Sequence, residues 1–400
     1  MSRPLASALG VFALALAIYT LSLAPSVFSW DSAELTLGIY TQGIVHATGY
    51  PLYLLLGRAF TLLPLSPDFA VRANLFSAVC GALTVALLYS VNLRLFGRPL
   101  IALTAALLYL YLPVRFTAQP EFNLVGQYFE RDLTHPTDLL WMVSGRMFGR
   151  EMLAYPLLDW LGEIVRFGGE LSLNYLGVGL ILGVIGIYHL WRTNRTLCLL
   201  LGAIFAVQVL FFSSYDVFDK NTMFHTAYLA WAIFIAAGCV RLLDALPYPT
   251  LVGFMAQLVM AQAATNWNTV GRAGDTFVAD RSRALLNILP PDATLIGPWT
   301  AVRPLEYMQI VDGERRDVRI VDVTLLALGE RDQLGGDSTH LAAAMETRLQ
   351  NVMVCASGQL FVVDPAILDA DLYPVEYVQT GLYRVIGFPS GECLTQFVSE

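Results

Sequence analysis

Long apolar runs separated by short polar connections fill the first two thirds of the chain. A helix of about 20 apolar residues is long enough to cross the hydrocarbon core of a bilayer. On this basis the sequence predicts seven membrane spans, over Pro4–Leu23, Val71–Leu93, Pro99–Pro113, Leu171–Trp191, Leu197–Phe212, Met223–Leu243 and Tyr248–Trp267. The first run is followed by no clear small-residue cleavage site, so we interpret it as an anchor and not as a signal peptide.

Two other apolar segments are too short or too polar to span. Leu52–Leu65 is interrupted by Arg58 and Pro64, which predicts an interfacial or re-entrant helix. Met152–Val165 is amphipathic, which predicts a helix that lies along the membrane.

From Asn268 onward helical and strand patterns alternate, as in a soluble domain. Helices are expected over 275–288, 301–311 and 338–352, and strands over 293–297, 317–323, 359–363 and 382–388. Such alternation is typical of an α/β domain with a partly parallel sheet. The predicted fold class is mostly α: a polytopic helical membrane bundle over 1–267, with outer loops 25–70 and 114–170, followed by a small extracytoplasmic α/β domain over 268–400.

Composition and charge agree with a membrane protein. Of the 400 residues 56% are hydrophobic and 14% are charged, whereas soluble domains carry about 25% charged residues. The arginines of the short connections fall on one side of the predicted spans: Arg3, Arg94, Arg98, Arg192, Arg195 and Arg241. The positive-inside rule places that side and the N-terminus in the cytoplasm, and the C-terminal domain outside a prokaryotic cell membrane. The net charge of −8 argues against a nucleic-acid partner.

The five cysteines show no metal-binding spacing. Cys80, Cys198 and Cys239 lie in apolar segments, where they are expected to pack as small hydrophobic side chains. Cys355 and Cys393 lie in the polar tail and could form a disulfide if that tail is outside the cytoplasm.

The segment Trp30–Tyr53 holds two acids, Asp31 and Glu34, at a predicted membrane surface. One interpretation is structural: Asp31 can cap a helix, and Glu34 can reach back to the backbone N–H of the cap. The other interpretation is catalytic, with a carboxylate acting as general base. The two roles are compatible. His46 likewise either caps the following Gly-Tyr-Pro turn or belongs to a catalytic or acceptor site.

The same segment carries a family resemblance. The acid motif Asp31-Ser32-Ala33-Glu34 is followed by His46, by Gly49-Tyr50-Pro51-Leu52-Tyr53 and by Gly57-Arg58. In this order they resemble the opening of the domain of unknown function 2723 family, except that Ala33 stands where glycine is usual. Further similar pieces extend the likeness over nearly the whole chain: Tyr111–Arg115, Val143–Arg146, Tyr215-Asp216, Ala227–Leu229 and the region 289–319.

The resemblance implies an inverting membrane glycosyltransferase of the GT-C type, whose eukaryotic relatives are protein O-mannosyltransferases. Such an enzyme moves a sugar from a polyprenyl-phosphate carrier to a hydroxyl of a protein or glycan on the outer face. The acceptor hydroxyl loses its proton to a carboxylate as it attacks. Arginine can stabilise the charge that grows on the leaving phosphate. The lipid-linked sugar is the donor, no bound cofactor is assigned, and a divalent metal remains open.

The resemblance also assigns candidate residues. Asp31 is the candidate base, and Glu34 is the second candidate or a partner that orients the acceptor or a metal. The candidate substrate-binding residues are His46, Tyr50, Arg58, Arg115, Arg146 and Arg150. The alternative for each arginine, and for Tyr50, is an anchor at the membrane interface.

The sequence departs from the family in its middle region. Family members carry several more spans before the outer loop, whereas here Pro99–Pro113 leads directly into it. GT-C folds build part of the donor groove from such helices. The alternative function is therefore a non-catalytic binding or assembly subunit that keeps the first loop and the outer domain. A transporter is disfavoured, because no predicted span carries a clear acid or base at mid-depth.

Overall fold

Helices dominate the part of the chain that the structure describes. The computed structural model describes residues 3–28, 31–47, 49–94, 122, 124–129, 131–217, 220–243, 257, 272–334, 341–356, 358–368, 373–379 and 381–387. They form two compact units, one from Met1–Met147 with Gly271–Glu400 and the other from Phe148–Val270. The span predicted at Pro99–Pro113 and Arg115 lie outside the described residues, as does the span at Tyr248–Trp267 apart from Gln257.

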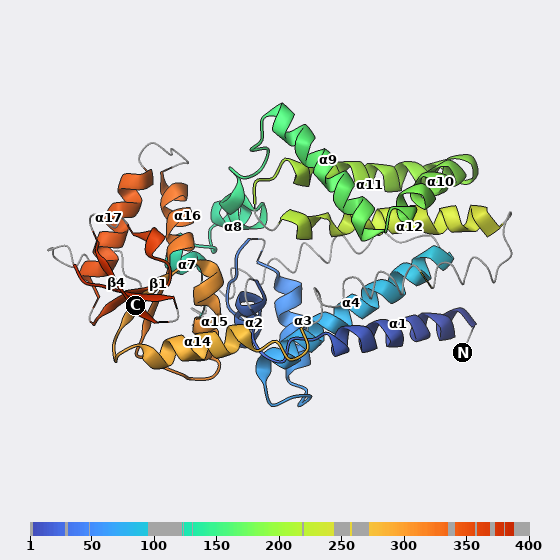
Figure 1. Cartoon of the computed structure of the whole chain (residues 1–400). Helices are drawn as coiled ribbons and strands as arrows, with labels where there is room; N and C mark the ends of the chain where they lie inside the picture. Colours follow the sequence, from blue (N-terminus) through green and yellow to red (C-terminus); the bar gives the residue numbers. More distant parts are fainter. Residues whose placement is uncertain are drawn as a thin grey trace. The chain divides into compact units, whose positions relative to one another are not determined.

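The N-terminal part of the first unit contains two long helices, α1 (Arg3–Leu21) and α4 (Phe69–Arg94), which pack against each other (Figure 1). A Cβ atom at Gly81 of α4 would come within 3.0 Å of the Tyr19 ring of α1, so glycine provides the room for that ring. Two shorter helices, α2 (Asp31–Thr41) and α3 (Pro51–Thr61), lie between them in sequence.

The helix predicted within Leu52–Leu65 is confirmed as α3. It begins at Pro51, where the ring fixes a helical φ and the missing N–H costs no hydrogen bond. The residues before it, Gly49 and Tyr50, have φ of 82° and 45°, so the chain makes a left-handed turn into the helix.

The C-terminal part of the first unit is an α/β domain, as predicted, with a five-stranded sheet of order β2-β1-β3-β5-β4. The pairs β1–β2 and β1–β3 are parallel and the other two are antiparallel, which confirms the partly parallel sheet. The elements are α14 (Phe277–Ile288), β1 (Thr294–Gly297), α15 (Trp299–Ile310), β2 (Arg319–Asp322), α16 (Val323–Gln333), α17 (Leu341–Val354), β3 (Leu360–Val362), β4 (Val375–Gln379) and β5 (Leu382–Val385). Of these, α16 and β4 were not predicted.

One hydrophobic core joins α2 to the α/β domain. Leu37 of α2 and Val45, just after it, are buried with Leu295 of β1 and Leu305 of α15. The helices α2 and α15 are in direct contact. The first compact unit therefore includes residues from both sides of the domain boundary predicted at residue 268. The acid motif and the C-terminal domain share one hydrophobic core.

The second unit contains α9 (Leu157–Asn174), α10 (Val178–Thr193), α11 (Arg195–Ser213) and α12 (His225–Leu243). The span predicted over Leu171–Trp191 covers the end of α9 and most of α10, and these two helices meet at an angle of 103°. Leu176 and Gly177 have φ of 54° and 67°. The N–H of Gly177 donates to the carbonyl of Ser172 at 2.7 Å, a bond of the kind that ends helices.

The described chain supports fewer membrane spans than the sequence predicted. By length and hydropathy α11 and α12 can each cross a membrane, and the bent pair α9–α10 adds a third if it counts as one. The apolar stretches described in α1 and α4 are shorter, Leu9–Leu21 and Phe69–Thr84. The described residues thus contain two to three candidate spans, two of the seven predicted spans lie almost entirely outside them, and a GT-C arrangement stays a prediction.

The remaining short elements complete the two units. The first includes α7 (Leu124–Tyr128), α8 (Pro136–Val143) and the 3₁₀ turn Pro365–Ile367, and the second includes the 3₁₀ turn Lys220–Phe224. The 3₁₀ turn Arg146–Phe148 lies at the boundary between the units. Cys355 is disulfide-bonded. Its expected partner, Cys393, lies outside the described residues.

Candidate functional site

The acid motif forms the first turn of α2. Asp31 is the first residue of the helix and is half-buried, and Glu34 lies one turn further on and is completely buried. Carboxylates in a first turn are stabilised by the partial positive charge at the helix N-terminus. The two acids therefore share a helix terminus but differ in their access to solvent.

Glu34 binds His46 through one carboxylate oxygen. The backbone N–H of His46 donates to Glu34 Oε1 at 2.7 Å, and His46 Nδ1 lies 3.0 Å from the same atom. The other oxygen, Oε2, is buried and has no hydrogen-bond partner among the residues that the structure describes. Because an ionised carboxylate only accepts, this contact places the proton of a neutral imidazole on Nδ1.

This geometry corrects one structural interpretation of the motif. A capping box requires the Glu34 carboxylate to reach back to the backbone N–H of the cap. Instead, Glu34 Oε1 accepts from His46 and Oε2 accepts from no group. The proximity of Asp31 to the helix N-terminus is confirmed, since α2 begins at this residue.

Two aromatic rings enclose the imidazole of His46. The hydroxyl of Tyr50 lies 3.3 Å from His46 Nε2, and the Tyr50 ring contacts the imidazole edge-on. On α15, the Trp299 ring meets it at 5.4 Å between centroids. The structure thus brings together three of the candidate residues, Glu34, His46 and Tyr50. Trp299 was missed, because no sequence pattern links it to a segment 250 residues earlier.

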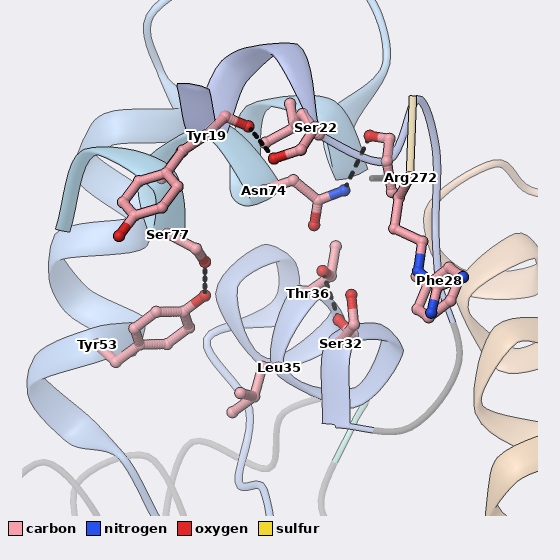
Figure 2. Close-up of a pocket in the computed structure, with 13 residues that line it drawn as sticks. Tyr19, Ser22, Phe28, Ser32, Leu35, Thr36, Tyr53, Asn74, Ser77 and Arg272 are labelled. Carbon is pink, nitrogen blue, oxygen red and sulfur yellow. Dashed lines mark hydrogen bonds between the residues drawn. The ribbon is translucent and has the colours of Figure 1, made fainter. Parts of the chain in front are cut away.

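Another face of α2 lines a pocket of about 370 Å³ (Figure 2). Ser32, Leu35 and Thr36 lie at spacings of three and four residues, which place them on one side of the helix. Across from them lie Tyr53 of α3 and the α4 residues Asn74, Ser77 and Ala78. Hydroxyl and amide groups mixed with apolar walls suit a ligand that carries both hydroxyls and an apolar part.

Three polar side chains of the pocket are held in place by hydrogen bonds. The Tyr53 hydroxyl and Ser77 Oγ lie 2.7 Å apart, and Asn74 Nδ2 donates to the carbonyls of Ala24 and Ser26. The charged residue in the described lining is Arg272. Its guanidinium lies over the Phe28 ring, 5.1 Å from the ring centroid (Figure 2). Its Nη1 is 3.4 Å from a carboxylate oxygen of Asp275. Arg272 was not among the arginines selected from the sequence.

The structure describes three of the four predicted arginines, Arg58, Arg146 and Arg150. Arg58 lies over the ring of Tyr40 at 5.7 Å. Tyr40 is nine residues after Asp31, so that contact is about 13 Å along the helix from the acid. Arg146 and Arg150 are exposed and belong to different units. Among the described residues, no group of three His, Cys, Asp or Glu side chains is placed to hold a metal ion.

Comparison with known proteins gives a match that starts at the acid motif. The family model of the Protein O-mannosyl-transferase TMEM260 N-terminal domain matches residues 31–109. That region of the chain is similar to an O-mannosyltransferase. It includes Asp31, Glu34, His46, Tyr50 and Arg58.

A mouse protein, Protein O-mannosyl-transferase TMEM260, is 37% identical over 97 residues. The aligned part is 24% of this chain and 14% of the mouse protein, so the chain spans a small fraction of that relative's length. No solved structure matches. The similarity supports the O-mannosyltransferase part of the expected resemblance, and not the domain of unknown function 2723 family specifically.

Proposed function

We propose that this chain is a membrane glycosyltransferase that moves a sugar from a polyprenyl-phosphate carrier to a hydroxyl of a protein or glycan. The observation that carries the proposal is the match to an O-mannosyltransferase N-terminal domain, which begins at Asp31. The pocket on α2 and the apolar helices support it, since the donor has both a polar head and an apolar chain.

In this proposal Asp31 is the general base. It is half-buried at the start of α2, whereas Glu34 is sealed and already bound to His46. Asp31 takes the proton of the acceptor hydroxyl while the hydroxyl oxygen bonds to the anomeric carbon. The bond from that carbon to the phosphate oxygen breaks, and its electron pair leaves with the lipid phosphate. Attack and departure on opposite faces invert the anomeric centre.

The other residues act on orientation and charge. Glu34 holds His46 so that its Nε2 faces Tyr50, and in this proposal His46 and Tyr50 orient the acceptor. Arg272 is the cation of the pocket and is our candidate for stabilising the leaving phosphate. Arg58 contacts Tyr40, so we assign it a weaker role. Arg146, Arg150 and Arg115 stay donor candidates by resemblance alone.

The alternative is a non-catalytic binding or assembly subunit, favoured by the distance of Arg58 from the acid motif and by the few spans described. The two functions are separated by incubating the purified full chain with radiolabelled mannosyl- and glucosyl-phosphoryl polyprenols and a mixture of acceptor peptides. Time-dependent label on the peptide supports the transferase. Absence of transfer from every carrier, by protein that is folded and monodisperse, leaves the non-catalytic function in its place.

A further inference from the structure

The helix α15 brings three functional groups from the α/β domain to the acid motif. Trp299 is its first residue, and Arg303 and Glu306 follow at spacings of four and three residues. These spacings place all three on one face of the helix. Because α15 packs against α2 in a common core, that face is held in a fixed position beside Glu34 and His46.

Trp299 connects Arg303 to the imidazole. Its ring contacts His46 on one side, at 5.4 Å between centroids, and lies 5.9 Å from the Arg303 guanidinium. The indole Nε1 is buried and has no hydrogen-bond partner. Both residues that flank His46, Glu34 and Trp299, therefore keep a buried polar atom without a partner, one an acceptor and one a donor. Such atoms are costly in a folded protein and occur at functional sites.

Arg303 is completely buried among carboxylates. Its Nη2 and Nε donate to Asp322 Oδ2 at 2.7 and 3.2 Å, and its Nη1 donates to Glu306. Asp322 also accepts the backbone N–H groups that begin α16. The charge of Glu34 acts on both Arg303 and Glu306.

The charges of this cluster do not balance when every group is ionised. One guanidinium pairs with the carboxylates of Asp322 and Glu306, and Glu34 adds a third negative charge nearby. Uncompensated buried charge is strongly unfavourable. A proton on Glu306 reduces this imbalance. Burial raises the pKa of Glu306 to about 7, with Asp322 and Glu34 adding to it and Arg303 opposing it.

We propose that α15 is part of the functional site, and that Trp299, Arg303 and Glu306 are positioning residues that fix the orientation and charge of the Glu34–His46 pair. Trp299 restrains the imidazole through its ring. Arg303 and Glu306 set the local charge beside Glu34. The C-terminal domain thereby completes a site whose first half is the acid motif. The consequence for sugar transfer rests on the proposed function, whereas the contact itself does not.

The test observes the His46 ring directly. Full-length protein is labelled with ¹⁵N-histidine, and the two ring-nitrogen signals of His46 are followed by NMR as pH is varied. In the parental protein a single Nδ1–H tautomer is expected. Trp299→Ala should yield mixed tautomers, and Trp299→Phe, which keeps an aromatic ring, should restore the parental pattern. Glu306→Gln removes the negative charge that Glu306 carries above about pH 7, so the His46 ring-nitrogen signals should differ from the parental ones at about pH 8 and match them at about pH 5.

Matched controls are Trp191→Ala and Glu314→Gln, which change an exposed tryptophan and an acid paired with Arg283. Both should leave the His46 signals unchanged. The proposal is overturned if Trp299→Ala and Glu306→Gln proteins of parental thermal stability show parental His46 signals. This measurement involves no sugar transfer, so a failed transfer assay would reject the proposed function without affecting the result.

Discussion

Two acids three residues apart differ because of the residues that each one contacts. Glu34 is sealed against His46, while Asp31 keeps partial access to solvent at the helix start. Local sequence predicts that both acids lie in one helical turn. It does not predict that Glu34 is sealed while Asp31 stays partly exposed, because His46 and Trp299 come from other segments. An assignment of base and partner therefore depends on tertiary contacts.

Glu306 makes stability depend on pH in a defined direction. Burial raises its pKa to about 7, above the ordinary value near 4.5. Between those two values the folded state holds one more proton than the unfolded chain, so the stability that this group contributes falls as pH rises. The thermal stability of Glu306→Gln relative to that of the parental protein should therefore rise as the pH is raised from about 5 to about 8.

Thermal unfolding at both pH values measures this change. Glu314→Gln is the control, because Glu314 is partly exposed and pairs with Arg283. An equal difference between Glu306→Gln and the parental protein at both pH values would contradict the raised pKa.

At the scale of elements, direct backbone contact brings two helices of the second unit close together. Gly186 of α10 and Gly238 of α12 lie against the carbonyls of Phe234 and Leu182, where a Cβ atom would overlap the opposing backbone. Such small residues allow apolar helices to approach closely. The close pairing of α10 with α12 follows from these two positions.

We expect Gly186→Ala to destabilise this helix pair strongly, because the added methyl group meets the Phe234 carbonyl and not a movable side chain. The matched control is Gly202→Ala in α11, where a Cβ atom meets nothing within 4 Å. That change should be neutral or stabilising by up to about 1 kcal/mol, since alanine is the better helix former. Thermal unfolding of both variants in the same detergent decides the matter. Equal stability of the two would contradict the close contact.

The same scale shows where sequence patterns succeed and fail. Alternating apolar segments correctly predicted β1, β2 and β3 together with α14, α15 and α17, because their buried faces have clear periods. The long apolar run at Leu171–Trp191 predicted one helix, yet it bends at Gly177. Mean hydropathy records composition and not the positive φ at which the chain turns. β4 was missed because its residues are mostly exposed.

At the scale of the whole molecule, the main result is that segments far apart in the sequence lie in one compact unit. The acid motif and the C-terminal domain belong to one contact unit, although a membrane-domain boundary was predicted between them. A boundary based on composition marks a change of solvent, whereas contacts show which segments fold together. The His46–Trp299 contact is the clearest case, and hydropathy contains no information about it.

The topology of the chain remains a prediction that follows from its arginines. With the N-terminus in the cytoplasm, the α/β domain lies outside the cell. A cysteine introduced at Asp312, on an exposed turn, should react with a membrane-impermeant maleimide in intact cells. Thr193→Cys, in a connection predicted to be cytoplasmic, should react only after lysis. The reverse pattern would invert the orientation and remove Asp31 from the outer face.

The central claim is that Asp31 acts as a base in sugar transfer, and Asp31→Asn tests it most directly. Asparagine serves a helix N-terminus about as well as aspartate, so helix stability should be preserved. It cannot accept the proton, so transfer should fall by roughly 10²–10⁴-fold. The measurement is the initial rate of sugar transfer from a polyprenyl-phosphate donor by parental and variant proteins of matched expression and thermal stability. A folded Asp31→Asn protein that transfers sugar at the parental rate would contradict the account.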